Sequence, residues 1–326
     1  MKPCKILNFP ETGTAARIDS ALELLPQRFR ACEETVKRLI FGSMKGEKQS
    51  LVCRLIRKRG IISDITRLDF EWSGTPPKAG QFFLVKPARS SVFLARPLGA
   101  AVYDENKIGF LAAVRGKGTA ELAAMYEGEE ALITGPLGNT WSDFIPEDNQ
   151  DNIKKPLALI SGGLGLAPVA ALSMELLRRS FTNFDFFAGF RREGEKMIAS
   201  LETEEKIDNA VIINEEEYTE KHKDTPSGGR SAKRGLVTDF LNAENYSAVF
   251  ACGPAPMLRA AAAKCRNAGT PCFVSLEARM ACGTGACLGC SLPSRGGAFK
   301  HCCSDGPVFN AEEVFFDEFF DGFNGI

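Results

Sequence analysis

The sequence predicts a chain of β and α/β architecture, in which an N-terminal antiparallel β-barrel is followed by a parallel, doubly wound sheet and a small C-terminal cysteine module. Three observations predict this fold class. Short strands broken by turns run to about residue 148, apolar strands alternate with helices from about 149, and cysteines cluster after 271. The expected modules are therefore 1–48, 49–148, 149–270 and 271–326, in keeping with a length of 326 residues.

The composition excludes several classes of protein. Forty Lys and Arg against 41 Asp and Glu leave a formal charge of -1, so no overall field attracts nucleic acid or an anionic membrane. The N-terminus, MKPCKILNFP, lacks a continuous apolar run, and no stretch reaches the roughly eighteen apolar residues of a membrane span. A cytoplasmic protein is expected, and its 11 cysteines are interpreted as thiols or metal ligands rather than disulfides.

The modules are predicted in order along the chain. Residues 1–48 are an extension of unknown role with a helical pattern from Asp19 to Phe41. The turns SGTPPKAGQ, DENKIG and YEGEE then separate short strands, which predicts the barrel. After the polar run 146–155, the strands PLALIS, FDFFAGF, AVIIN and AVFACG alternate with helices, which predicts the parallel sheet. The polar segment 221–234 is expected to be a surface loop.

The cysteines late in the chain give the most specific chemical signal. Cys282, Cys287 and Cys290 have C-x4-C-x2-C spacing, and Cys303 follows after twelve intervening residues. This spacing is typical of a plant-type [2Fe-2S] site. Three glycines allow the loop to fold tightly and to point its N–H groups at the cluster sulfurs: Gly283, Gly285 and Gly289.

Two alternatives remain open for this site. A zinc site also takes four cysteines, but it usually shows two C-x2-4-C pairs, and one short pair is present here. Cys302 and Cys303 both stand where the fourth ligand is expected, and spacing does not decide between them.

Two turns of the α/β module are candidates for nucleotide binding. The strand Leu157–Ser161 runs into GGLGLAP (162–168) before a helix, and a later strand ends in ACGP (251–254). A glycine-rich turn lets the backbone approach a pyrophosphate at a helix N-terminus, and ligands bind at the carboxyl ends of parallel strands. The alternatives are a packing role for the glycines and a structural role for Cys252 as a small buried residue.

The barrel module carries a second candidate site. Arg96-Pro97-Leu98-Gly99 is expected to end a strand, and Gly116-Lys117-Gly118-Thr119 to open a helix. An arginine and a helix N-terminus with a threonine hydroxyl are suitable partners for a diphosphate. The alternative for Arg96 is a solvated strand residue.

Taken together, the order RPLG, GKGT, GPLGN, GGLGLAP, ACGP and C-x4-C-x2-C resembles the ferredoxin-NADP reductase superfamily with an iron-sulfur domain at the C-terminus. Within it, the sequence is most similar to the electron-transfer subunits of class 1B, NAD-linked dihydroorotate dehydrogenases. The segments SLEARMACGTGACLGC (275–290) and CSDGPVF (303–309) are the most specific, and the resemblance covers about residues 50 to 315.

The resemblance implies an FAD-binding barrel at 49–148, a Rossmann-like NAD-binding domain at 149–270 and a [2Fe-2S] module at 271–326. It implies flavin contacts from Arg96, Pro97, Leu98, Gly99, Leu111, Ala112, Ala113, Gly118 and Thr119. It implies NAD contacts from Gly162, Gly163, Gly165, Ala167, Pro168, Cys252, Gly253 and Pro254. The implied cluster ligands are Cys282, Cys287, Cys290 and Cys303.

Three features depart from the family pattern. Gly99 stands where the family usually has serine, which removes a hydroxyl that could bond the flavin. The segment after AVIIN is longer and differently charged than the family's short D-G-S turn. The extension 1–48 is additional.

The resemblance implies a function in pyrimidine (UMP) biosynthesis. Electrons from the dihydroorotate-reduced FMN of a catalytic partner subunit would pass through the cluster and FAD to NAD+, in a heterotetramer. Flavin is needed because nicotinamide exchanges two electrons as hydride and the cluster one at a time. No side chain of this chain is expected to perform covalent catalysis. One alternative is a reductase subunit for ferredoxin, sulfide or another redox partner, and another is a non-catalytic zinc or iron-sulfur protein on a degenerate reductase scaffold.

Overall fold

The structure is a computed structural model that describes residues 49–145, 155–201, 210–214, 232–295 and 297–314. The chain divides into two compact units, Met1–Lys45 and Gly46–Ile326, and the description below concerns the second. The helix predicted within 1–48, the polar run 146–154 and most of the predicted loop 221–234 lie outside the described residues.

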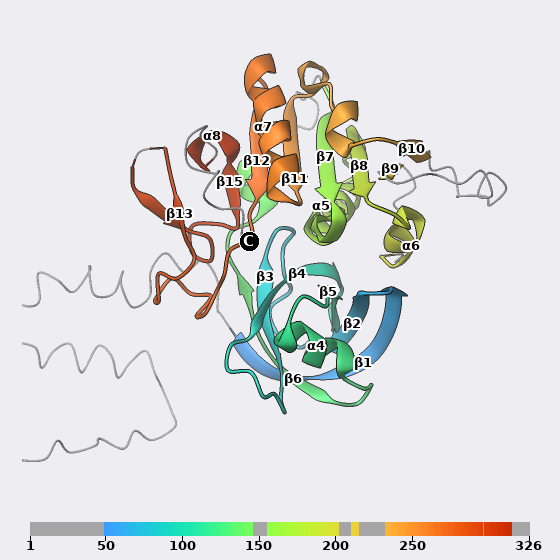
Figure 1. Ribbon diagram of the computed structural model, residues 1–326, viewed down its shortest axis with the longest axis vertical. Coiled ribbons are helices and arrows are strands. Elements are labelled where there is room, and N and C mark those ends of the chain that lie inside the picture. Colours follow the sequence, from blue (N-terminus) through green and yellow to red (C-terminus); the bar gives the residue numbers. More distant parts are fainter. Residues whose placement is uncertain (1–48, 146–154, 202–209, 215–231, 296, 315–326) are drawn as a thin grey trace, which may run out of the picture. The chain divides into compact units, whose positions relative to one another are not determined.

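Six antiparallel strands close into a barrel, as predicted (Figure 1). Their order around the barrel is β1-β2-β5-β4-β3-β6. The bounds are β1 Gln49–Ile62, β2 Ile65–Glu71, β3 Phe82–Pro87, β4 Arg96–Tyr103, β5 Lys107–Ala113 and β6 Glu130–Leu137. Closure leaves no free sheet edge, and aromatic side chains such as Trp72, Phe83 and Phe110 fill the interior. The helix α4 (Lys117–Ala124) packs on the barrel through the buried Leu122.

The prediction that Arg96–Gly99 ends a strand is wrong, because these residues begin β4. The sequence pattern indicates a strand near this point. It does not show whether the strand ends or begins at Arg96, because that depends on pairing with another strand. Residue Arg96 pairs with Val85 of β3, and this pairing sets the start of the strand.

The second sheet has seven strands in the order β10-β9-β8-β7-β11-β12-β15. The bounds are β7 Leu157–Gly162, β8 Phe184–Phe190, β9 Ala210–Asn214, β10 Ala232–Arg234, β11 Ala248–Cys252, β12 Cys272–Ser275 and β15 Val308–Asn310. All neighbours run parallel except β15, which is antiparallel to β12. The predicted parallel sheet is confirmed, although Ala232–Arg234, expected in a loop, pairs with β9 because a parallel edge still offers backbone partners.

Helices cover both faces of this sheet. Leu159 of β7 packs in the same core cluster as residues of α5 (Leu166–Arg178) and α6 (Gly194–Ala199), whereas Ile160 packs with residues of α7 (Ala255–Ala268). Every residue of β7 is buried as a result, which explains the run of apolar residues at 157–160. The sequence order of the strands reverses between β7 and β11, so a ligand crevice is expected where these two strands end.

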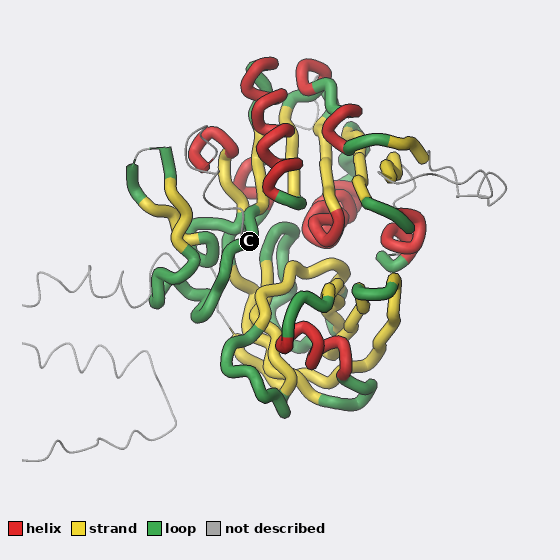
Figure 2. The backbone as a smooth tube through the Cα atoms, in the orientation of Figure 1, coloured by secondary structure: helices red, strands yellow, loops and turns green. Residues whose placement is uncertain are grey.

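The cysteine module follows β12. Residues 276–290 form irregular loop, and β13 (Ser291–Pro293) pairs with β14 (Phe299–His301) in a small antiparallel sheet (Figure 2). The chain then returns through β15 to the larger sheet and ends its described part in α8 (Ala311–Val314). Within the described residues, no helix has the length and apolar character that crossing a membrane requires.

Candidate functional site

The side chain of Arg96 lies directly against the first turn of α4. A Cβ atom on Gly118 would stand 2.9 Å from Nε of Arg96, so glycine is needed for this approach. Nη2 of Arg96 donates to the carbonyl of Leu94 at 2.7 Å, and Nε is buried without a partner among the described residues. The first N–H groups of a helix also lack intrahelical partners. An arginine and a helix start with unused donors form a cradle for a diphosphate.

The hydroxyl of Thr119 stabilises this cradle from within. It accepts hydrogen bonds from the N–H groups of Arg115 and Gly116 at 2.9 and 3.1 Å, and donates to the carbonyl of Gly116 at 3.0 Å. The sequence suggested the hydroxyl itself as a donor for a ligand. Because the hydroxyl proton is already directed to Gly116, Thr119 would offer a ligand its backbone N–H instead.

The two other predicted flavin segments lie on neighbouring strands. Ala100 of β4 pairs with Phe110 of β5 in an antiparallel ladder, so Arg96–Gly99 and Leu111–Ala113 extend from that pair in the same direction. A Cβ on Gly99 would lie 3.7 Å from Cδ of Pro168, which is an ordinary contact distance. The barrel segment therefore faces the start of α5, and a serine at position 99 would fit there.

The two glycine-bearing turns of the α/β module touch each other through their backbones. Ser161 pairs with Cys252 at the ends of β7 and β11. A Cβ on Gly165 would lie 2.1 Å from the carbonyl oxygen of Cys252 and 2.7 Å from the nitrogen of Gly253. A Cβ on Gly162 would likewise lie 2.9 Å from Cδ of Pro254. Both turns follow the carboxyl ends of parallel strands, as the sequence predicted, and the strand order brings them together at the reversal point of the sheet.

One polar group beside these turns, the hydroxyl of Ser161, was missed at the level of sequence. The hydroxyl of Ser161 is fully buried and lacks a hydrogen-bond partner within the described part of the chain. Burial of the Cys252 thiol, together with the nearby charge of Glu277, raises the pKa of Cys252 well above its ordinary value. Cys252 is therefore a neutral, buried thiol rather than a reactive thiolate.

The four predicted cluster cysteines are brought together by two segments. Sγ of Cys290 lies 3.2 Å from Sγ of Cys303, although the two residues are 13 positions apart. Cys282 and Cys287 stand on the loop before them, and the N–H of Cys287 donates to Sγ of Cys282 at 3.4 Å. Gly283 (φ +68°) and Gly285 (φ +87°) take left-handed backbone conformations that allow this tight loop.

Backbone N–H groups point at all four sulfurs. The donors, with their distances to sulfur, are Thr284 to Cys282 at 3.4 Å, Gly289 to Cys287 at 3.4 Å, Cys303 to Cys290 at 3.4 Å and Gly285 to Cys303 at 3.1 Å. Burial opposes ionisation of Cys282, but the N–H groups of Thr284 and Cys287 outweigh it and lower the pKa of Cys282 to about 6. Such donors stabilise thiolates and tune the potential of a bound cluster.

The structure separates Cys302 from Cys303. Sγ of Cys302 is fully buried and donates to the carbonyl of Leu276 at 3.1 Å. Sγ of Cys303 points to Cys290 instead. Burial and the neighbouring Cys290 raise the pKa of Cys303 to about 12.

The arrangement of the four thiols fits an iron-sulfur cluster. A [2Fe-2S] cluster distributes four thiolates over two irons. The close pair Cys290 and Cys303, the separate pair Cys282 and Cys287, and the inward N–H groups match that arrangement.

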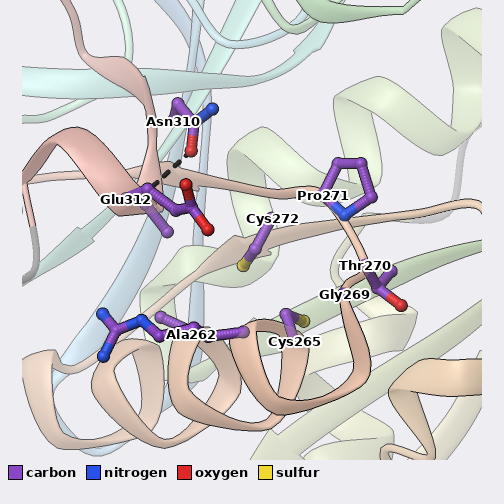
Figure 3. Close-up of a pocket in the computed structure, with 10 residues that line it drawn as sticks. Ala262, Cys265, Gly269, Thr270, Pro271, Cys272, Asn310 and Glu312 are labelled. Atoms are coloured by element: carbon purple, nitrogen blue, oxygen red, sulfur yellow. Dashed lines mark hydrogen bonds between the residues drawn. The ribbon is translucent and has the colours of Figure 1, made fainter.

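A cavity of about 220 Å³ lies at the opposite end of β12 (Figure 3). Cys265 of α7 and Cys272 of β12 line it, and their thiols interact, which lowers the pKa of Cys265 and raises that of Cys272. Cys272 begins β12, whereas the two glycine-bearing turns and the loop that carries Cys282 and Cys287 lie near the end of that strand. The cavity is therefore separate from the candidate site.

The fold and site define a class of protein: a ferredoxin-reductase-like chain with a C-terminal iron-sulfur module. In solved structures, NADH-dependent reduced ferredoxin-NADP oxidoreductase is similar at 24% identity and a TM-score of 0.63, over 85% of this chain and 94% of that one. A flavohemoglobin from Malassezia yamatoensis, solved with bound FAD and heme, is similar at 21% identity and a TM-score of 0.54, over 72% and 61%.

The chain belongs to the family of dihydroorotate dehydrogenase B (NAD(+)) electron transfer subunits. The subunit from Caldanaerobacter subterraneus subsp. tengcongensis is 35% identical over 268 residues, which cover 81% of this chain and 97% of that protein. The subunit from Clostridium acetobutylicum is 34% identical over 241 residues, which cover 74% and 87%. Residues 277–315 match the family model of the iron-sulfur cluster binding domain of dihydroorotate dehydrogenase B.

Proposed function

We propose that this chain is a cytoplasmic electron-transfer subunit that connects NAD with the FMN of a catalytic subunit oxidising dihydroorotate, in pyrimidine biosynthesis. The two kinds of subunit would assemble as a heterotetramer. Membership of the family supports the proposal, since the similar proteins are named as NAD(+)-linked electron transfer subunits. When bound, FAD supplies the conversion between two-electron exchange with nicotinamide and one-electron exchange with the cluster.

Each cofactor is assigned to a separate set of residues. We assign the [2Fe-2S] cluster to Cys282, Cys287, Cys290 and Cys303. The diphosphate of FAD is assigned to Arg96 and the start of α4, with backbone and apolar contacts from the rest of Arg96–Gly99 and from Leu111–Ala113. NAD is assigned to the turns 162–168 and 252–254. None of these residues exchanges a proton with substrate in this assignment, and their contribution is to bind, orient and tune.

The domain assignment follows the same division. We assign 49–148 to FAD, 149–270 to NAD and 271–326 to the cluster, with 1–48 as an extension of unassigned role. β12 and β15 of the cluster module also complete the sheet of the NAD module, so the two modules share a strand layer. This sharing favours a fixed rather than a flexibly tethered cluster.

One observation carries the proposal: the barrel contacts both of the other modules at the candidate sites. A Cβ on Gly283 of the cluster loop would lie 2.8 Å from Cδ1 of Leu84 and 3.1 Å from that of Leu137, so the loop packs on β3 and β6. At the other contact, Gly99 faces Pro168 at the nucleotide turn. A flavin held by the barrel would thus lie between nicotinamide and cluster, as the two-step transfer requires.

The experiment has two stages. The chain purified under anaerobic conditions should be coloured, with FAD and two irons per polypeptide, because a [2Fe-2S] cluster has two irons. The complex with an FMN-containing dihydroorotate dehydrogenase subunit should then reduce NAD+ when dihydroorotate is added. A colourless, iron-free chain would overturn the cofactor assignment. A loaded chain that dihydroorotate does not stimulate would overturn the choice of partner and leave a reductase for ferredoxin, sulfide or another acceptor.

A further inference from the structure

Asn139 joins the barrel to the segment that follows the last cluster cysteine. Its Nδ2 donates to the carbonyls of Val308 and Asp305 at 2.8 and 3.2 Å, and its Oδ1 accepts from the N–H of Val308 at 2.9 Å. Its own N–H donates to the carbonyl of Gly306 at 2.7 Å. One residue just after β6 therefore makes four hydrogen bonds to a segment that begins two residues after Cys303.

An amide is the side chain that fits this geometry. It satisfies the N–H and the C=O of Val308 at the same time, as a neighbouring strand would. The preceding residue, Gly138 (φ +79°), allows the close approach, because a Cβ there would lie 2.5 Å from Cδ of Pro307. The contact is therefore specified by two adjacent residues of the barrel rather than by general packing.

The same segment is held from its other side by the sheet. Val308 pairs with Ser275 of β12, and the N–H of Leu276 donates to the carbonyl of Pro307 at 2.9 Å. The path after Cys303 is thus fixed between the end of β12 and the end of β6. Asn139 supplies the barrel side of this fixation.

The first cluster segment is positioned on the same part of the barrel. Gly283, next to Cys282, packs on Leu84 and on Leu137, which lies two residues before Asn139. Arg96 and α4, which form the diphosphate cradle, belong to this barrel too. The loop with Cys282, the segment after Cys303 and the proposed diphosphate site are therefore all held by the same β-barrel.

We propose that Asn139 is a positioning residue for electron transfer, which acts through the Cys303 segment to fix the cluster relative to the flavin. The inference deepens the proposed function and rests on it. Asn139 touches neither group in this proposal. Without the Asn139 side chain, the segment after Cys303 would be held by β12 but no longer by the barrel. The distance between the cluster and the flavin would then become longer and more variable.

The test uses the complete chain loaded with FAD and iron. Asn139→Ala removes three side-chain hydrogen bonds, and Asn139→Asp keeps the size but loses the two donated ones. Asn310→Ala is the matched control, because Asn310 lies on β15 with Val308, and within the described residues its side chain accepts one hydrogen bond, from the N–H of Glu312 at 3.0 Å. Stopped-flow absorbance would follow the reduction of flavin by NADH and then the reduction of the cluster.

We expect both Asn139 variants to reduce flavin at the wild-type rate and to pass electrons to the cluster severalfold more slowly, because the rate of electron tunnelling falls exponentially as the distance between the redox centres grows. The midpoint potential of the cluster should stay unchanged, which separates a change of distance from a change of driving force. Hydrogen exchange of the Val308 and Leu276 amides should accelerate in Asn139→Ala, which removes the acceptor of the Val308 N–H, and this readout needs no turnover.

The outcomes distinguish the inference from the proposed function. The positioning role would be overturned if both Asn139 variants passed electrons to the cluster at the wild-type rate although hydrogen exchange at the Val308 amide had become faster in Asn139→Ala. Equal slowing in Asn310→Ala would also overturn it, because general destabilisation would then be the cause. A wild-type chain without flavin or iron would overturn the proposed function together with this inference.

Discussion

The contact between the two nucleotide turns is most directly tested by Gly165→Ala. Gly165 has φ -59°, which alanine adopts freely, so the substitution adds a methyl group without backbone strain. That methyl would lie 2.1 Å from the carbonyl oxygen of Cys252 and 2.4 Å from its carbon. Ordinary contact begins at 3.4 Å, so the turns must separate by about 1.3 Å.

Forcing one methyl into such a packed contact costs about 1–3 kcal/mol. If the separated turns bind NADH less well by that amount, the dissociation constant rises about 5- to 150-fold. A titration of NADH against the oxidised, FAD-loaded chain would measure it. The FAD content should not change, because the diphosphate cradle of Arg96 and α4 lies on the barrel.

Gly60→Ala is the control, since a Cβ at Gly60 meets no atom within 4 Å. It should leave NADH affinity and the melting temperature as in the wild type. An unchanged dissociation constant in Gly165→Ala would refute the assignment of these turns to NAD. A lower melting temperature with unchanged affinity would show that the contact serves the fold and not the nucleotide.

Three further predictions concern single side chains. Arg96→Ala should weaken FAD binding about 10- to 150-fold in a flavin titration, since a hydrogen bond to a charged group contributes about 1.5–3 kcal/mol; wild-type affinity would contradict the cradle. Cys303→Ser should remove iron and the visible cluster absorbance, whereas Cys302→Ser should retain both, because Cys302 points to a carbonyl; the reverse pattern would exchange their roles. Tyr246 donates to Asp185 at 2.9 Å, and burial and this carboxylate raise the pKa of Tyr246 above its ordinary 10.0. The hydrogen bond therefore stabilises fully below pH 10 and is lost at higher pH, so Tyr246→Phe should cost about 1 kcal/mol in denaturant unfolding at pH 7 and less in strong alkali; a cost that grew with pH would contradict this.

Much of the architecture could be predicted because it follows from local patterns. The alternation of short strands and turns in the barrel and the apolar run at 157–160 each reflect how many faces of a strand are buried. The predicted barrel and parallel sheet are confirmed on these grounds. The edge strand at Ala232–Arg234 and the start of β4 at Arg96 were missed, because each depends on a partner strand elsewhere in the sequence.

The candidate site shows the same division. The presence of a cysteine loop and two glycine-bearing turns could be predicted from spacing. The role of the Thr119 hydroxyl in holding its own loop could not, since a helix start gives no sign of whether its side chains face a ligand or the backbone. Asn139 stood within the GPLGN motif that contributed to the family resemblance, and this motif was the available signal for it.

The sequence by itself determined the number of thiols, the order of the modules and the positions of the tight turns. These properties depend on residues close together along the chain, where spacing and backbone conformation restrict each other. Tertiary structure decided which of Cys302 and Cys303 turns toward Cys290, and that Asn139 reaches Asp305 across 166 positions. Such contacts form where separate elements pack against each other. A hydrogen bond between residues far apart in the sequence produces no pattern in either segment from which it could be predicted.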